Sequence, residues 1–97
     1  MEIVWLEGAK IDAENIVDYY TNNVGRDQAI KIVGKINEVL NLLSRHPLIG
    51  RYVEDTHTRE FPVLGSSYKI IFANSESKIY VLRIFNTKQN PDKKFTK

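Results

Sequence analysis

The side chains that could carry out chemistry are few, and their spacing limits what that chemistry could be. The chain has no cysteine and only two histidines, His46 and His57, so it has neither a disulfide framework nor a thiolate metal site. The carboxylates Asp12, Glu14 and Asp18 lie in a stretch of helical periodicity, and we interpret them as a solvated helix face rather than as acid–base catalysts. The sequence has no glycine-rich phosphate loop and no nucleophile elbow. We therefore expect no cofactor and no metal ion.

Positive charge is the remaining chemical feature, and it is unevenly distributed. Residues 1–27 hold six acids and two bases, a net charge of −4, whereas residues 28–97 hold twelve bases and six acids, a net charge of +6. A basic region of this kind suits an anionic partner such as RNA or an acidic protein, and an ordinary solvated surface has the same composition.

Two β-rich runs must position the central cations of this region. Tyr68–Ala73 and Lys78–Phe85 are dominated by Val, Ile, Tyr and Phe, and the turn formers Asn74–Ser77 separate them, which predicts a β-hairpin. The predicted register places Tyr68 opposite Arg83, Ile70 opposite Val81 and Phe72 opposite Ile79.

The two-residue alternation of strands divides this hairpin into two faces. The nearly apolar face is predicted to meet helices, and it consists of Tyr68, Ile70, Phe72, Ile79, Val81, Arg83 and Phe85. The mixed face consists of Lys69, Ile71, Ala73, Lys78, Tyr80, Leu82 and Ile84. We expect the mixed face to contact either another macromolecule or the C-terminal segment of the same chain.

The residues before the hairpin predict two helices between short strands. Apolar residues recur at spacings of three and four in Gly8–Val24 and from Gln28 to about Arg45, with Gly25 ending the first helix and Asp27 capping the second. The short linker predicts an antiparallel helix hairpin. Close approach of the two helices would explain Gly34 within the second.

Strands are predicted at Glu2–Leu6 and Thr58–Val63. Because Pro62 cannot donate a hydrogen bond to a neighbouring strand, the second is predicted to be an edge strand or an irregular one. The fold class is therefore α+β, in the order β-α-α-β-β-β, with the helix hairpin packed on one face of an antiparallel sheet. Residues 1–97 should form a single domain with a polar, basic tail from about residue 87. No signal peptide or apolar run of membrane length is evident, so we expect a soluble, cytoplasmic protein.

Particular residues follow one another in a distinctive order along nearly the whole chain. They are Trp5, Ala9, Ile16, Tyr19-Tyr20, Ala29, Ile36, Leu43, Pro47, Gly50-Arg51, Arg59, Tyr68–Phe72 and Val81–Phe85. This succession resembles the RelE/ParE superfamily of bacterial toxins from type II toxin–antitoxin modules. The resemblance implies a growth inhibitor held by a cognate antitoxin, as a homodimer or a toxin–antitoxin hetero-oligomer. RelE-like members cleave messenger RNA on the ribosome without metal or cofactor, whereas ParE-like members bind and poison DNA gyrase.

The residues present favour the ParE-like branch. RelE-like nucleases usually carry two lysines two residues apart on the strand before the hairpin, where this sequence has Glu60 and Pro62. The tail Thr87–Lys97 has no tyrosine or histidine to act as acid or base. The cations that could still support RNA cleavage are Lys69, Arg83 and Lys88. This set is too small for metal-free cleavage, so the chain is not expected to be a nuclease.

The resemblance and the hairpin faces together predict two binding surfaces. The target, gyrase or ribosome, would be bound by cations, namely Arg51, Arg59, Lys69, Arg83 and Lys88. The antitoxin would be bound by the mixed hairpin face, through Ile71, Tyr80, Leu82 and Ile84. We therefore predict a gyrase-poisoning toxin of the plasmid-stabilisation type. The alternatives are a ribosome-dependent endoribonuclease and a degenerate toxin retained as a binding module. Arg83 has a structural alternative of its own, stacked on Tyr68 at the strand end.

Overall fold

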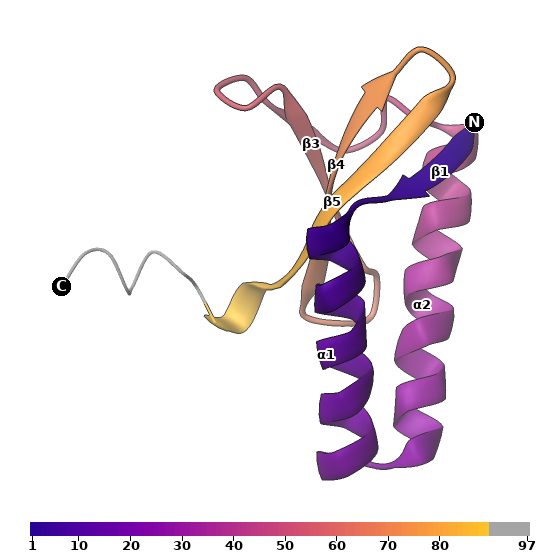
Figure 1. Ribbon diagram of the computed structural model, residues 1–97, viewed down its shortest axis with the longest axis vertical. Helices are drawn as coiled ribbons and strands as arrows, with labels where there is room; N and C mark the ends of the chain where they lie inside the picture. Colours follow the sequence, from indigo (N-terminus) through magenta and orange to yellow (C-terminus); the bar gives the residue numbers. More distant parts are fainter. Residues whose placement is uncertain (90–97) are drawn as a thin grey trace, which may run out of the picture.

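The computed structural model describes residues 1–89, which form a pair of helices packed on a five-stranded sheet (Figure 1). The elements are β1 (Glu2–Trp5), α1 (Glu7–Asn23), α2 (Arg26–Arg45), β2 (Arg51–Val53), β3 (Thr58–Pro62), β4 (Tyr68–Ser75), β5 (Lys78–Asn86) and the 3₁₀ helix η1 (Thr87–Gln89). The strand order in the sheet is β1-β5-β4-β3-β2. The predicted α+β class and helix hairpin are confirmed. The structure adds the short strand β2 and makes β1 parallel to β5, whereas the other pairings are antiparallel.

The helix hairpin turns at Gly25, which serves both helices. The amide groups of Val24 and Gly25 both donate to the carbonyl of Tyr20, which ends α1 as predicted. The Gly25 carbonyl then accepts from the Ala29 amide at 3.1 Å and begins α2. Its φ of 149° is one that other residues rarely adopt. Asp27 is therefore not the N-cap but lies in the first turn, where its charge favours the helix dipole.

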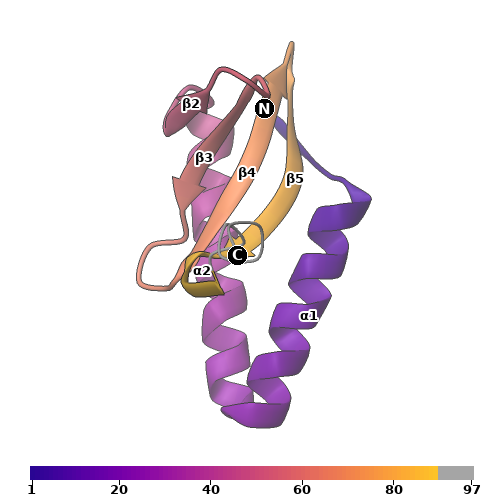
Figure 2. The ribbon, with the colours of Figure 1, turned by 90° about the vertical axis from the view of Figure 1, so that its left-hand side faces the viewer.

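Both helices cover the same face of the sheet (Figure 2). In this view α2 lies behind the strands and α1 runs alongside β5, which it contacts. The core between the layers consists of Ala9, Ile16, Ile32, Ile36, Val39, Leu40, Leu43, Val63, Tyr68, Ile70, Phe72, Ile79, Val81 and Ile84. Val33, one of the apolar residues that recur at spacings of three and four along α2, is 37% exposed. Gly34 does not mark close helix contact, because an added Cβ would meet nothing within 4 Å.

The β4–β5 hairpin differs from the predicted register because its turn is shorter. The strands continue to Ser75 and resume at Lys78, and Glu76 in the turn has a φ of 54°. In the observed register Tyr68 pairs with Asn86, Ile70 with Ile84, Ile71 with Arg83, and Phe72 with Val81. Leu82 is thus an extra residue on β5, a β-bulge that shifts the alternation of every residue after it.

The bulge exchanges the faces assigned to the end of β5. Ile84 is 4% exposed and belongs to the core, so its prediction as a surface residue is wrong. Arg83 and Phe85 leave the core face, where the uninterrupted alternation had placed them. Before the bulge the predicted faces are confirmed, with Ile79 and Val81 buried and Tyr80 half-buried between them.

The other end of the sheet is shaped by Pro62 and Gly50. The prediction of an edge strand at Thr58–Val63 is wrong, because β3 lies between β4 and β2. Pro62 is tolerated there because β2 pairs with β3 over Thr58–Glu60 only and does not reach it. At Gly50, just before β2, φ is 99° and an added Cβ would lie 2.5 Å from the Glu60 carbonyl oxygen. Only glycine fits this position without displacing the backbone.

Candidate functional site

The sheet face turned away from the helices carries a three-residue ionic group. Glu60 of β3 accepts hydrogen bonds at Oε1 from Arg51 Nη2 on β2 and from Lys69 Nζ on β4, both at 3.1 Å. Burial acts to raise the pKa of Glu60, but the hydrogen bonds and charges of Lys69 and Arg51 outweigh it and lower the pKa below its usual value. The carboxylate therefore stays ionised and neutralises part of the positive charge predicted to meet a target.

Apolar side chains surround this ionic group on the same face. Ile71 pairs with Glu60 across the strands, and Phe85 pairs with Lys69. Three of the four residues predicted to bind an antitoxin, Ile71, Tyr80 and Leu82, are half-buried. The fourth, Ile84, lies on the opposite face beyond the bulge. The C-terminal residues that would have to cover this face in the alternative prediction include 90–97, which lie outside the described residues.

Arg59 is separate from the ionic group and holds a loop in place. Its Nη1 donates to the carbonyl of Leu48 at 2.9 Å and to that of Gly50 at 3.4 Å. Its guanidinium carbon lies 5.2 Å from the centre of the Tyr52 ring, within cation–π range. These contacts tie the α2–β2 connection to the sheet, so part of the hydrogen-bonding capacity of Arg59 is used inside the fold.

Arg83 is clamped by a carboxylate from α1. Its Nε and Nη2 donate to Oδ2 and Oδ1 of Asp12 at 2.7 and 3.0 Å, and the Ile84 amide donates to Oδ2 at 2.8 Å. The guanidinium carbon of Arg83 also lies 4.9 Å from the centre of the Phe85 ring, rather than on Tyr68. The hydrogen bonds that Arg83 donates to Asp12 raise the pKa of Arg83 further, so this cation is permanently charged.

Asp12 acts as a hydrogen-bond acceptor for β5 because β5 extends beyond the end of its neighbour β1. β1 pairs with β5 only from Lys78 to Val81, and the Ile84 amide beyond that point lacks a strand partner. The carboxylate supplies the missing acceptor. The side chain of Asp12 is 13% exposed, so its interpretation as a solvated residue is wrong. The signal in the sequence that points to such an acceptor is the difference in length between the predicted strands Glu2–Leu6 and Lys78–Phe85.

A polar cavity of about 590 Å³ lies between α1 and the end of β5, and it brings Arg83 and Lys88 together. Tyr19, Tyr20 and Tyr68 also line it, with the rings of Tyr20 and Tyr68 6.5 Å apart. Burial raises the pKa of Tyr68, so its phenol stays neutral at physiological pH. The cavity can therefore offer hydrogen bonds, aromatic surface and positive charge to a partner.

The five predicted target-binding cations thus occupy three separate places. Arg51 and Lys69 share Glu60, Arg59 faces the loop before β2, and Arg83 and Lys88 line the cavity. The ion pairs found within residues 1–89 involve Arg51, Lys69 and Arg83, and none of them involves Lys88. In that same part of the chain no cluster of three His, Cys, Asp or Glu side chains could hold a metal ion. This distribution suits contact with an extended surface better than convergence on one reacting atom.

Comparison with known proteins assigns the family. Residues 3–91 match the family described as ParE toxin of type II toxin-antitoxin system, parDE. This chain belongs to the ParE toxin family. The fold of this ParE family member is similar to a solved structure described as "Chromosomal ParDE TA system from P. aeruginosa", with a TM-score of 0.77 and 26% sequence identity. The match covers 89% of this chain and 95% of that chain.

The family assignment confirms the predicted resemblance and its ParE-like branch. It also supports an antitoxin as a partner of this ParE family member, because the family and the matching structure are both described as toxin–antitoxin systems. A search of curated proteins finds no significant match. None of the helices described in residues 1–89 is long and apolar enough to cross a membrane.

Proposed function

We propose that this chain is a toxin that arrests growth by binding and poisoning DNA gyrase, and that a cognate antitoxin neutralises it. Membership in the ParE family supports the toxin role. The observation that carries the choice of a protein target over RNA is the position of Glu60. Its carboxylate lies between Arg51 and Lys69, within 3.1 Å of both cations.

A surface that cleaves RNA requires cations that no carboxylate neutralises, unlike Arg51 and Lys69 beside Glu60. Metal-free cleavage needs uncompensated cations around the phosphate, because negative charge builds up there in the transition state. Here Glu60 would repel a phosphate approaching Lys69, and Pro62, the partner of Lys69 on β3, has no donor to offer. A protein target suits this surface better, since protein interfaces combine mixed charges with apolar and aromatic side chains such as Ile71 and Phe85.

Neutralisation would follow from the same geometry. Tyr80 and Leu82, proposed to bind the antitoxin, share the outer sheet face with Arg51 and Lys69, proposed to bind the target. An antitoxin segment covering the apolar side chains would therefore exclude the target sterically. The toxin would be free to act only when the antitoxin is lost.

The decisive experiment measures the activity of gyrase and the integrity of translated messenger RNA with the same preparation of purified toxin. Purified toxin should inhibit supercoiling by gyrase and increase cleaved DNA–gyrase complexes. Lys88→Glu should weaken both effects, because Lys88 is exposed and none of the ion pairs within residues 1–89 involves it. The matched control is Lys31→Glu, the same charge change at an exposed position of α2.

Primer extension on translated message separates the alternatives. Intact transcripts together with trapped gyrase support the proposal. Codon-phased cuts with unaffected gyrase would replace it with the endoribonuclease function. If induction without antitoxin leaves growth, gyrase and transcripts unchanged, the chain is a degenerate toxin and the proposal fails.

A further inference from the structure

The polar cavity between α1 and the end of β5 is built around an arginine that is held in place. Gly8, one helical turn before Asp12, leaves room for the Arg83 side chain, because an added Cβ would lie 2.9 Å from its Cδ. Asp12 accepts from the Nε and Nη2 of Arg83, and the guanidinium carbon lies 4.9 Å from the centre of the Phe85 ring. The hydrogen bonds formed within residues 1–89 leave Nη1 unused. The guanidinium therefore has one orientation and keeps donor capacity for a partner.

Lys88, the second cation of the cavity, is fixed through its backbone. The Lys88 amide donates to Oδ1 of Asn86 at 3.0 Å, and the same oxygen accepts from the Ser67 hydroxyl at 3.1 Å. Thr87 donates through both its amide and its hydroxyl to the Ser67 carbonyl, each at 2.7 Å. These bonds hold the start of η1 against the residues before β4. The backbone of Lys88 thus has a defined position beside the cavity that its side chain lines.

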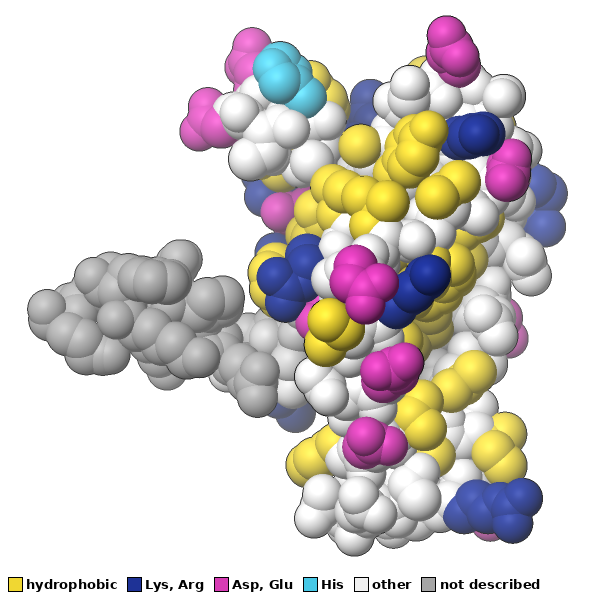
Figure 3. Space-filling view, in the orientation of Figure 1, with side chains coloured by type: hydrophobic (Ala, Val, Ile, Leu, Met, Phe, Trp, Pro, Cys, Tyr) yellow, Lys and Arg dark blue, Asp and Glu magenta, His cyan; other side chains and the backbone are white. Residues whose placement is uncertain are grey.

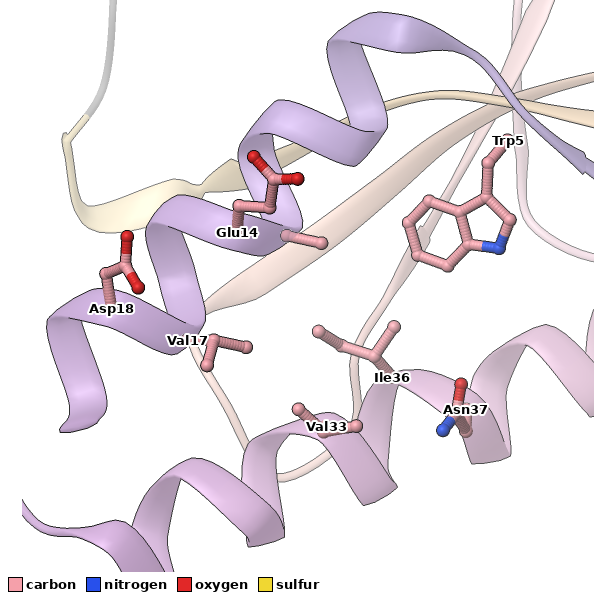
Figure 4. A pocket seen from close by; sticks show the side chains of 8 residues that line it. Trp5, Glu14, Val17, Asp18, Val33, Ile36 and Asn37 are labelled. Carbon is pink, nitrogen blue, oxygen red and sulfur yellow. The ribbon is translucent and has the colours of Figure 1, made fainter.

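The cavity lining is positive although α1 carries several acids. Of the described residues that line it, three are charged, namely Asp12, Arg83 and Lys88, a net charge of +1. Figure 3 shows acidic side chains in a row along α1, with Lys or Arg side chains at its left, on the side where β5 ends. Glu14 and Asp18 line a different hollow, the groove between the two helices (Figure 4). Since Asp12 is already paired with Arg83, the cavity offers positive charge to an anionic partner.

Three tyrosines give the cavity an aromatic wall. The ring centres of Tyr19 and Tyr20 are 5.5 Å apart, and those of Tyr20 and Tyr68 are 6.5 Å apart. Tyr19 is 54% exposed, so its ring and hydroxyl remain accessible to a partner. A neutral phenol donates an O–H group to an anion, and its ring packs edge to face on another aromatic ring. The cavity therefore suits a ligand that carries an anionic group beside an aromatic one.

We infer that this cavity receives an acidic segment of gyrase, with a carboxylate held by Arg83 and Lys88 and an aromatic side chain packed on Tyr19. The choice of gyrase rests on the proposed function, whereas the acidic and aromatic character of the segment rests on the cavity. The cavity is continuous with the outer sheet face proposed to bind the target, because Phe85 lines it and also pairs with Lys69 of that face. The segment extends the same interface around the end of β5.

A peptide suits this cavity better than a nucleic acid does. Nucleic-acid binding depends on the neutralisation of several phosphates by lysine and arginine side chains. The described residues of the cavity lining include two cations, of which Arg83 is already paired with Asp12. One carboxylate can accept charge-assisted hydrogen bonds from both cations, and its neighbours in a peptide can supply the aromatic contact.

Calorimetric titration of the purified toxin with synthetic peptides tests the chemistry of the segment. The acidic probe carries aspartates on either side of a phenylalanine, and the matched probe has asparagine in place of each aspartate. The acidic peptide should bind at least about tenfold more tightly, because only its carboxylates can pair with the two cations. A single-stranded DNA oligonucleotide is the third probe, and it should bind more weakly than the acidic peptide.

Substitutions on the two sides of the cavity provide the matched variants. Lys88→Glu should abolish the preference for the acidic peptide, whereas Lys31→Glu, the same charge change at an exposed position of α2, should preserve it. Gly8→Ala should weaken the acidic peptide by about threefold through one displaced rotamer of Arg83, and leave the asparagine peptide unchanged. Circular dichroism of each variant verifies that the fold is retained.

Photocrosslinking identifies the segment of gyrase that enters the cavity. The photoreactive residue p-benzoylphenylalanine replaces Tyr19, and mass spectrometry maps the gyrase peptide that it captures. The control places the same residue at Ile30, an exposed position of α2 that does not line the cavity. The toxin with the label at position 19 should capture an acidic segment, and the toxin with the label at position 30 should not.

Three results would overturn the inference. They are equal affinity for the two peptides, tighter binding of the DNA oligonucleotide than of the acidic peptide, and capture at position 19 of a gyrase segment without acidic residues. Gyrase assays on the same preparations keep the two proposals separate. If gyrase is not inhibited while the acidic peptide keeps its preference, the proposed function fails and the chemistry of the cavity stands. Inhibition of gyrase together with equal affinity for the two peptides overturns the inference alone.

Discussion

Removal of the Asp12 carboxylate should destabilise the fold more than removal of the arginine that it holds. Asp12 accepts from the Arg83 guanidinium at 2.7 and 3.0 Å and from the Ile84 amide at 2.8 Å. Asp12→Ala therefore leaves two donor groups without their acceptor. Arg83→Met keeps most of the side-chain volume and leaves the bond between Asp12 and the Ile84 amide in place.

The magnitudes follow from the exposure of each partner. The Ile84 amide is part of a residue that is 4% exposed, and a buried donor without an acceptor costs roughly 1–3 kcal/mol. The Arg83 side chain is 48% exposed, so its ion pair is worth about 0.5–1 kcal/mol. Asp12→Ala should therefore lower the free energy of unfolding by about 1.5–4 kcal/mol, and Arg83→Met by about 0.5–1 kcal/mol. A domain of this size has roughly 5–15 kcal/mol in total, so the first loss is a large fraction.

Urea denaturation followed by circular dichroism and Trp5 fluorescence measures both losses. The slope of the transition should stay constant while its midpoint falls, because each variant changes stability and not the surface exposed on unfolding. The double variant completes a mutant cycle that isolates the coupling between Asp12 and Arg83. A loss at Arg83→Met equal to that at Asp12→Ala would refute the assignment of Asp12 as the acceptor that completes the edge of β5.

Three further predictions concern other parts of the fold. Gly50→Ala should lower the free energy of unfolding, measured by urea denaturation, by at least about 1–3 kcal/mol, because φ is 99° and the new Cβ would lie 2.5 Å from the Glu60 carbonyl oxygen. Gly34→Ala should instead stabilise α2 by about 0.5–1 kcal/mol, because its new Cβ would meet nothing within 4 Å. The pKa of Glu60 is lowered on folding, so the ionised carboxylate stabilises the fold at pH values above 4.5, its ordinary pKa, and this stabilisation is lost as the pH falls below that value. Glu60→Gln should therefore flatten this part of the curve of unfolding free energy against pH. Leu82→Glu should leave the fold intact and weaken antitoxin binding in calorimetry, whereas Ile84→Glu, at a position only 4% exposed, should unfold the chain.

Much of the fold could be predicted from the sequence because it depends on local patterns. Helical spacing of apolar residues located both helices, and Gly25 located the turn between them. The β-rich runs located β4 and β5. β2 could not be found in this way, because three residues in a turn-rich segment carry no periodicity. The family resemblance likewise depended on an order of residues that can be read along the chain.

By itself, then, the sequence determined both helices, the strands other than β2, the family and the branch, together with the acid at position 60 where a nuclease would carry a lysine. Only the tertiary structure decided which residues work together. The bulge at Leu82 moves Ile84 into the core and Arg83 out of it, and it exists only because β4 and β5 pair in one register. The clamp joins Asp12 to Arg83 across 71 positions of the chain. Such contacts depend on the packing of distant segments, which no local periodicity encodes.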